Sequence, residues 1–482
     1  MKMAALLLIL RALSLAQQIA IGSYAAPTQD SGPDVITQGP DGALWFTEGD
    51  NISQIGRISP AGAITQYTHP TVSTTSGITA GPDGALWFTE WAGVIGRSTT
   101  AGAITEYPVP TPDSGSSTIA AGPDGALWFT ESYTNKIGRI TTAGAFTEYP
   151  IPTANSYPFG IAAGSDGALW FCENEANQIG RVTTAGAFTE YRVPTANSKL
   201  NWITAGPDGA LWFVEHRGNI GRITTEGVIA EYPVSPGPYE IAVGPDGALW
   251  FTLANKIGRI TTAGVATEYP LPTAGNVPYG ITAGPDGALW IAEYGHNAIG
   301  EVVFVTANLS VTPDSGVYQS NLSFTGSGFA PGESVQIYSG GIGSAVVASG
   351  TADAGGSISA AGIVPDSVYG PRIFLGVGQS SGKLGAADFS MTPRLIMSPN
   401  SGPVGSYTTP NGVGFPSFAP VRIYWNNPRT FLGEIFADYR GTLTGISTFQ
   451  FLVPSGAPQG ENEVIGQEQG GTPTALGYFT VQ

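Results

Sequence analysis

Seven copies of one heptapeptide, Gly-Pro-Asp-Gly-Ala-Leu-Trp, constrain the fold of this chain more than any other feature. One copy has Ser165 in place of proline, and successive copies lie 38 to 42 residues apart. Seven of the ten tryptophans therefore occupy one structural position: Trp45, Trp87, Trp128, Trp170, Trp212, Trp250 and Trp290. A repeat of this length indicates an architecture in which each unit buries its faces against its neighbours.

Each repeat predicts four short strands. In the unit that begins near Tyr157, strands are expected at residues 160–163, 168–173, 179–182 and 188–194, separated by Gly- and Thr-rich turns. Proline presets φ at the second position of the first turn, and glycine accepts the positive φ that closes it. No stretch has the 3.6-residue periodicity of a helix. Seven four-stranded units of about 41 residues predict an all-β fold, a seven-bladed β-propeller at residues 17–305.

The last unit lacks a fourth strand of its own. Six fourth strands are expected, at Ile64–Pro70, Ile104–Pro110, Phe146–Pro152, Phe188–Pro194, Ile229–Ser235 and Ala266–Pro272. Residues 24–33 align without gaps to residues 149–158, which end such a strand and continue beyond it. We therefore expect an N-terminal strand near residues 19–27 to complete the last blade and close the ring.

The pattern changes after about residue 306. The segment from Ser327 to Tyr338 matches the segment from Val413 to Tyr424 at an offset of 86 residues. Two tandem modules of short strands with Gly, Pro and Ser turns predict two immunoglobulin-like (Ig-like) β-sandwiches, at residues 306–391 and 392–482, similar to repeats that end many bacterial secreted and surface proteins.

Composition limits the partners and the compartment. The net charge of −17 and the pI near 4.5 argue against a nucleic-acid partner. Cys172 is the single cysteine, so we expect neither a disulfide within the chain nor a thiolate metal cluster. Residues 1–16 combine Lys2, an apolar run and a Ser-Leu-Ala site, which predicts a signal peptide and a secreted or cell-surface protein, with the periplasm as an alternative. We expect a monomer without a membrane span.

Acidic residues recur where the second strand of each unit ends. Six of the seven units have glutamate there: Glu48, Glu90, Glu131, Glu173, Glu215 and Glu293. A ring of carboxylates is one way to hold Mg²⁺ or Ca²⁺. Six units also carry a third-strand arginine, at Arg57, Arg97, Arg139, Arg181, Arg222 and Arg259. Because six glutamates are matched by six arginines, the sequence favours structural Glu–Arg pairs over a ring of carboxylates around a metal ion.

Histidines and aromatic residues lie in the loops on the same face. His216 and His296 follow Glu215 and Glu293 directly or within three residues, whereas His69 ends a fourth strand and is expected to be structural. Flat rings beside carboxylates suit sugars, apolar peptides or small molecules. The candidate ligand-binding residues are Trp91, Phe159, Trp202, Tyr239, Tyr279 and Tyr294.

The repeat, typified by GITAGPDGALW and NKIGRITTAG, closely resembles that of the virginiamycin B lyase (streptogramin lyase) family over residues 19–305. The resemblance implies a seven-bladed propeller that opens the ring of B-type streptogramins by elimination, with Mg²⁺ polarising an oxygen and a base taking the proton α to a carbonyl. It also implies base histidines in Pro-His-Gly-Ile or Pro-His-Ala-Ile motifs where first strands begin in the last two blades.

None of the corresponding positions here is histidine. They are Asp34, Ser76, Ser117, Phe159, Asn201, Tyr239 and Tyr279. Tyrosine is a poor base, since its ordinary pKa is about 10. The sequence therefore favours a secreted propeller that binds a glycan, a peptide or a small molecule. The alternatives are a metal-dependent lyase with a relocated base, for which His216, His296, Glu215 and Glu293 are candidates, and a structural or adhesion protein of the cell surface.

Overall fold

A computed structural model describes residues 18–482 except 50–53, 72, 273–274, 318, 341–343, 366–369, 414, 416–419, 427–428, 438–442, 444–449 and 469–473. The predicted signal peptide lies outside the described residues. These residues form two compact units, 30–303 and 18–29 with 304–482. The one helix among them is a 3-10 turn, η1 (Tyr294–His296), so none of the described helices is long and apolar enough to cross a membrane.

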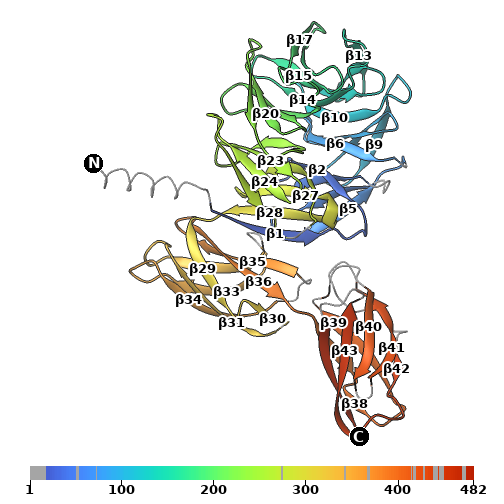
Figure 1. Ribbon diagram of the computed structural model, residues 1–482, viewed down its shortest axis with the longest axis vertical. Coiled ribbons are helices and arrows are strands. Elements are labelled where there is room, and N and C mark those ends of the chain that lie inside the picture. Colours follow the sequence, from blue (N-terminus) through green and yellow to red (C-terminus); the bar gives the residue numbers. More distant parts are fainter. Residues whose placement is uncertain are drawn as a thin grey trace. The chain divides into compact units, whose positions relative to one another are not determined.

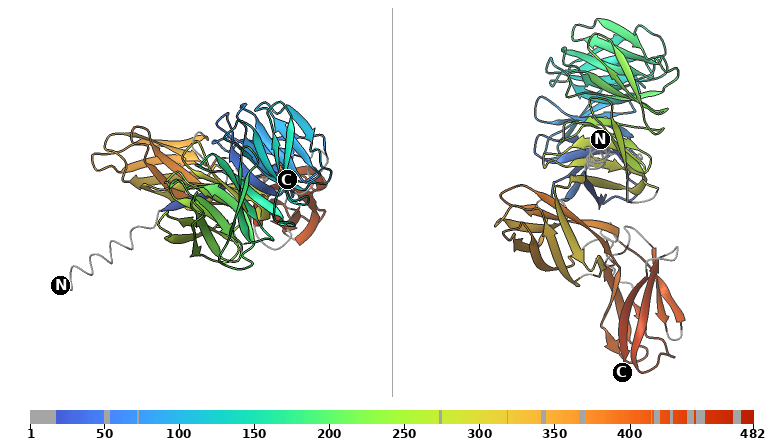
Figure 2. Two further views of the ribbon diagram at one scale, coloured as in Figure 1. Left: turned by 90° about the horizontal axis from the view of Figure 1, so that it is seen from above. Right: turned by 60° about the vertical axis from the view of Figure 1, so that its left-hand side comes forward.

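Four-stranded sheets make up the first unit (Figures 1 and 2). In one of them, β2 (Pro33–Gln38), β3 (Leu44–Glu48), β4 (Gln54–Ile58) and β5 (Ile64–Thr68) pair antiparallel in chain order. Six four-stranded sheets within the described ranges have their strands in chain order.

The remaining strands follow the same order. The other first strands are β6 (Thr75–Ala80), β10 (Ser116–Ala121), β14 (Pro158–Ala163), β18 (Leu200–Ala205), β22 (Ile241–Val243) and β26 (Pro278–Ala283). The second strands are β7 (Leu86–Glu90), β11 (Leu127–Glu131), β15 (Ala168–Glu173), β19 (Leu211–Glu215), β23 (Leu249–Leu253) and β27 (Leu289–Glu293). The third strands are β8 (Val94–Ser98), β12 (Lys136–Ile140), β16 (Gln178–Thr183), β20 (Asn219–Ile223), β24 (Lys256–Ile260) and β28 (Ala298–Phe304).

Five fourth strands are β9 (Ile104–Pro108), β13 (Phe146–Pro150), β17 (Phe188–Arg192), β21 (Ile229–Pro233) and β25 (Ala266–Pro270). Like β5, they end two residues before the expected boundary. After β9, β13, β17 and β25 the next residue still bonds through its backbone N–H, as Val109 does to Gly93, but the proline that follows it has no N–H to continue the ladder. The sheet with β26, β27 and β28 has the order β1-β28-β27-β26, in which β1 is Ile19–Ala25.

First strands contact one another around the unit. Each contacts the next along the chain, and β26 contacts β2. Gly280 shows how closely they approach, because a Cβ there would lie 2.6 Å from the Asp34 carbonyl oxygen. The described sheets thus form a propeller whose first strands surround its centre.

Each repeated heptapeptide forms a turn that its tryptophan closes. In the first copy, Gly42 has φ +72°, and the Trp45 indole Nε1 donates to Asp41 at 3.1 Å. Gly39 leaves the space that the indole fills, since a Cβ there would lie 2.4 Å from the ring. Tyr67 from β5 stacks on Trp45 with centroids 5.3 Å apart. All seven repeat tryptophans are fully buried, which supplies much of the apolar burial in a charge-poor chain.

The second unit contains two separate apolar clusters. One includes Phe324, Phe329 and Phe389, and the other includes Phe415, Trp425 and Phe479. The strands around the first cluster are β29 (Ala307–Thr312), β30 (Ser315–Gly316), β31 (Asn321–Ser327), β32 (Ser334–Ser339), β33 (Val346–Thr351), β34 (Ile358–Ile363), β35 (Gly370–Gly378) and β36 (Leu384–Met391). The strands around the second cluster are β37 (Arg394–Ser398), β38 (Ser401–Gly402), β39 (Tyr407–Val413), β40 (Pro420–Asn426), β41 (Arg429–Phe436), β42 (Phe451–Leu452), β43 (Gly460–Glu468) and β44 (Thr474–Val481). Strand β1 contacts β35 within this unit.

Candidate functional site

A cavity of about 260 Å³ lies where the first strands of the propeller begin. Six of its lining residues occupy one repeat position, namely Asp34, Ser76, Phe159, Asn201, Tyr239 and Tyr279. Val35, Trp202 and Glu240, each one residue further along the chain, complete the lining. The cavity therefore lies at the positions where the resemblance led us to look for histidines. Ser117, the seventh such position, is buried but does not line it.

Aromatic rings extend from the cavity toward the loops. Tyr239 meets Tyr279 edge to face with centroids 4.8 Å apart, and Tyr279 contacts Tyr294 at 4.9 Å. His216 is exposed and packs beside Tyr239 at 5.2 Å, with its Nδ1 3.2 Å from the Pro238 carbonyl oxygen. Four of the six candidate aromatic residues, Phe159, Trp202, Tyr239 and Tyr279, are thus brought together in the lining.

Two other candidate aromatic residues do not line the cavity. Tyr294 lies against Tyr279, and Trp91 packs instead against Tyr133 at 5.5 Å. His296 is exposed in η1 and does not line the cavity either. Neither candidate histidine therefore belongs to the cavity lining, although His216 contacts the lining residue Tyr239.

Glu240 is a cavity residue that the sequence analysis did not single out. It is buried, and desolvation, opposed by a hydrogen bond from the Ile281 backbone and reinforced by the charge of Asp34, raises its pKa well above the ordinary value. At the equivalent positions the other repeats carry Val35, Gly77, Thr118, Gly160, Trp202 and Gly280. The sequence signal for Glu240 was that it is acidic whereas the equivalent residues of the other six repeats are not.

The expected pairing of the second-strand glutamates with the arginines is wrong. Arg57 pairs with the turn residue Asp41, its Nε 2.7 Å from Oδ2, and the same pair recurs at Arg97–Asp83, Arg139–Asp124, Arg181–Asp166, Arg222–Asp208 and Arg259–Asp246. The reason is strand alternation. Arg57 lies opposite Trp45 in the register, whereas Glu48, three residues after Trp45, projects from the other face.

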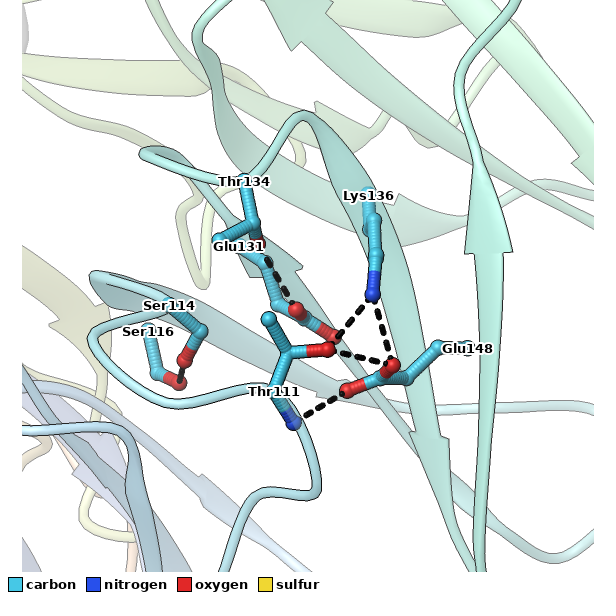
Figure 3. Close-up of polar contacts among 7 residues, drawn as sticks. All are labelled: Thr111, Ser114, Ser116, Glu131, Thr134, Lys136 and Glu148. Carbon is cyan, nitrogen blue, oxygen red and sulfur yellow. Dashed lines mark hydrogen bonds and ion pairs between the residues drawn. The ribbon is translucent and has the colours of Figure 1, made fainter.

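These glutamates are buried away from the cavity, and none lines it. Figure 3 shows the arrangement at Glu131, which accepts a hydrogen bond from Thr134 at 2.9 Å. Nearby, Lys136 pairs with the fourth-strand Glu148 at 2.8 Å, and Glu148 binds the backbone N–H and the hydroxyl of Thr111 from the preceding sheet. The glutamates thus stand among contacts within and between sheets, and the metal candidates Glu48, Glu90, Glu131 and Glu173 do not line the cavity.

Burial changes the protonation of the same carboxyls. Desolvation raises the pKa of Glu90 and Glu173 to about 8, and that of Glu131 and Glu215 to about 7. It also raises the pKa of Glu48. Glu293 is buried too and accepts a hydrogen bond from Asn276 at 2.8 Å. In the absence of a cation, burial therefore favours the protonated form of Glu90, Glu131, Glu173 and Glu215.

The cavity lining itself offers oxygen donors to a cation. Asp34 supplies a carboxylate and Asn201 supplies an amide oxygen, whereas burial favours the protonated form of Glu240. Mg²⁺ is commonly bound through one or two carboxylates while it keeps several waters. The donor set therefore fits the metal that the resemblance implies.

Comparisons with known proteins agree with this fold. The family model described as the virginiamycin B lyase family matches residues 11–235 and 186–312. The crystal structure of the virginiamycin B lyase from Staphylococcus aureus is 42% identical with a TM-score of 0.58, covering 60% of this chain and all of that one. A catalytically inactive histidine-to-alanine variant of the S. aureus lyase with quinupristin is 41% identical over the same shares, with a TM-score of 0.57.

More distant structures share the fold alone. The extracellular domain of the putative hybrid two component system BT4673 from B. thetaiotaomicron is 13% identical, with a TM-score of 0.51 over 78% of this chain and 60% of that one. No curated protein matches the chain. The family match spans more than half of the 482 residues, from residue 11 to residue 312. The chain is therefore a member of the virginiamycin B lyase family.

Proposed function

We propose that this chain is a secreted, monomeric, seven-bladed propeller that binds a compact ligand in the cavity formed by its first strands. The observation that carries the proposal is the lining, in which four aromatic side chains stand beside Asp34 and Glu240. Aromatic faces supply apolar contact area, and the carboxyls fix orientation by accepting or donating hydrogen bonds. A glycan unit, a short peptide or a small molecule with hydroxyl, amide or ammonium groups fits this chemistry.

The rest of the architecture supports a secreted binding protein. We propose that β1 completes the seventh blade and that the two apolar clusters of the second unit are the cores of Ig-like modules at residues 306–391 and 392–482. Such modules serve as spacers or docking units, which suits a protein outside the cell. The extracellular domain from B. thetaiotaomicron shows the same fold in an extracellular protein.

Binding is tested by calorimetry after a screen of glycan and peptide arrays and of B-type streptogramins. We expect Tyr279→Ala and Trp202→Ala to weaken binding at least about tenfold, since each removes a ring from the lining. The matched control is Tyr133→Ala, which removes an exposed ring that does not line the cavity. Equal affinity in all three variants would place the ligand elsewhere.

A second candidate is a lyase, and Glu240 favours it. A buried carboxyl with a raised pKa beside a second carboxyl is suited to proton transfer. Tyr279 and Trp202 would position the substrate, and Glu240 would take the proton α to a carbonyl as the C–O bond at the next carbon breaks and the carboxylate leaves. A bound Mg²⁺, for which Asp34 would supply a carboxylate and Asn201 an amide oxygen, would polarise the carbonyl oxygen, which leaves Glu240 to act as the base.

The lyase candidate is tested by mass spectrometry of a B-type streptogramin incubated with the protein and Mg²⁺. Ring opening is an elimination, so the linear product keeps the mass of the substrate and is separated from it by chromatography. Activity that is lost in Glu240→Gln and kept in His216→Ala would establish the lyase with Glu240 as its base. An unchanged substrate would leave ligand binding as the function.

A further inference from the structure

His69 occupies an apolar position of the repeat. It follows β5, two residues after Tyr67, and the equivalent residues in five other repeats are Val109, Ile151, Val193, Val234 and Leu271. The side chain of His69 is nonetheless fully buried. An imidazole in a site that elsewhere holds an aliphatic group needs polar partners, because a buried polar group without them is costly.

The partners that face His69 are two carboxylates of the next sheet. Its Nδ1 lies 3.6 Å from Oε1 of Glu90, at the end of β7, and 3.6 Å from Oε1 of Glu106, in β9. Neither ring nitrogen of His69 and neither carboxylate oxygen of Glu90 makes a hydrogen bond. Glu106 accepts bonds from the Thr71 backbone N–H at 2.9 Å and from its hydroxyl at 2.7 Å.

The neighbouring sheet shows what is missing here. At the pair equivalent to Glu90 and Glu106, Thr134 donates to Glu131 and the Lys136 ammonium neutralises Glu148 (Figure 3). The residue equivalent to Lys136 is Val94, which carries no charge. The buried carboxyl of Glu90 and the half-buried carboxyl of Glu106 therefore lack the cation that their counterparts have.

We propose that His69, Glu90 and Glu106 bind a divalent transition metal ion, with Zn²⁺ as the best-matched ion, that links the two neighbouring sheets. One ligand atom from each residue lies within 4.8 Å of the others. Ligands of a tetrahedral zinc at about 2.0–2.2 Å stand about 3.4 Å apart, so the 3.6 Å separations need little adjustment. Imidazole and carboxylate are both common zinc ligands. A dication also balances two carboxylates beside a neutral ring.

This site is distinct from the central cavity, since none of its three residues lines that cavity. Burial lowers the pKa of His69, which favours the neutral ring that a metal requires. The expected role is structural, because the metal would join the chain that leaves β5 to β7 and β9 and would supply the charge that Lys136 supplies in the neighbouring sheet.

The test uses the full chain produced in Zn²⁺- or Co²⁺-supplemented medium and dialysed. We expect one metal ion per chain by elemental analysis, a visible Co²⁺ spectrum typical of tetrahedral coordination, and a rise in Tm over the chelator-treated protein. His69→Val installs the residue found at position 109 and should fold while losing the ion and the spectrum. Glu90→Gln should weaken binding at least about tenfold.

Controls separate this site from adventitious binding. Glu131→Gln changes the equivalent glutamate of the neighbouring sheet, and the double variant His216→Ala/His296→Ala removes the exposed histidines. Both should keep the ion and the Co²⁺ spectrum. A chain that carries no metal, or one whose metal survives both His69→Val and Glu90→Gln, would overturn the proposal, and the first outcome would identify a metal-free His–carboxylate cluster.

Discussion

At the scale of single residues, burial raises the pKa of the repeated glutamates, and neighbouring charges and hydrogen-bond donors adjust it. Glu131 has the Thr134 hydroxyl and Glu215 has the Asn219 amide, and the pKa of each is raised to about 7. The pKa of Glu90 and that of Glu173 are raised to about 8 by desolvation, and the charges of Glu106 and Glu190 add to the effect. Desolvation raises all four, and donors that stabilise the charged form offset part of it.

Raised pKa values predict that the propeller loses stability as pH rises. The folded state keeps the proton of Glu173 up to about pH 8, whereas the unfolded chain releases it near its ordinary value of 4.5. Between these values the folded state binds more protons, so the free energy of unfolding falls with increasing pH. Glu173→Gln should flatten this fall and stabilise the propeller by about 4 kcal/mol at pH 8. Below pH 4 its effect on stability should be small.

Thermal melts from pH 4 to pH 9, followed by circular dichroism, measure this slope. The control is Glu226→Gln, because Glu226 is exposed and its pKa is not raised. A Glu173→Gln profile parallel to that of the unaltered chain would show that Glu173 ionises normally in the folded state.

At the scale of strands and sheets, a glutamate in each of five fourth strands accepts hydrogen bonds from a Thr or Ser residue of the preceding sheet. Glu190 in β17 accepts a bond from the Thr153 backbone N–H at 3.0 Å and one from its hydroxyl at 2.9 Å. The same arrangement recurs at Glu106–Thr71, Glu148–Thr111, Glu231–Thr195 and Glu268–Ser235. In four of the five pairs a proline precedes the threonine and ends the strand ladder, so this bond fixes the position of the chain where it leaves the preceding sheet.

We therefore expect the effects of substituting Thr153 and Glu190 on the free energy of unfolding to be coupled in a double-mutant cycle. Thr153→Val keeps the backbone donor but removes the hydroxyl, and should cost about 1 kcal/mol. Glu190→Ala should cost more, because it leaves both donors without the carboxylate. The double variant should show a coupling of about 1 kcal/mol. Thr189→Val, an exposed neighbour on β17, is the control and should change little. Purely additive costs would mean that the contact contributes no stability.

At the scale of the whole chain, the repeated sequence made the fold predictable, whereas the candidate site is formed by residues that differ from one repeat to the next. Because seven copies of the repeat predict the same strands, the all-β fold and the propeller were predictable from the sequence. Glu240 and His69 were not recognised, because each matters only through residues of other repeats. The Glu–Arg pairs were mispredicted from matching numbers, although the alternation of Trp45, Arg57 and Glu48 in the strands already excluded them.

Ring closure gives the last prediction, because β1 is the outer strand in the order β1-β28-β27-β26. Removing residues 17–28 would leave β28 as a bare edge with unpaired backbone groups. We expect this deletion to lower and broaden the thermal transition of the propeller and to promote aggregation. Removing residues 393–482 deletes a separate apolar cluster and should leave that transition in place. Calorimetry of both truncated chains decides the matter, since an unchanged propeller transition without residues 17–28 would mean that the ring is held by its first strands alone.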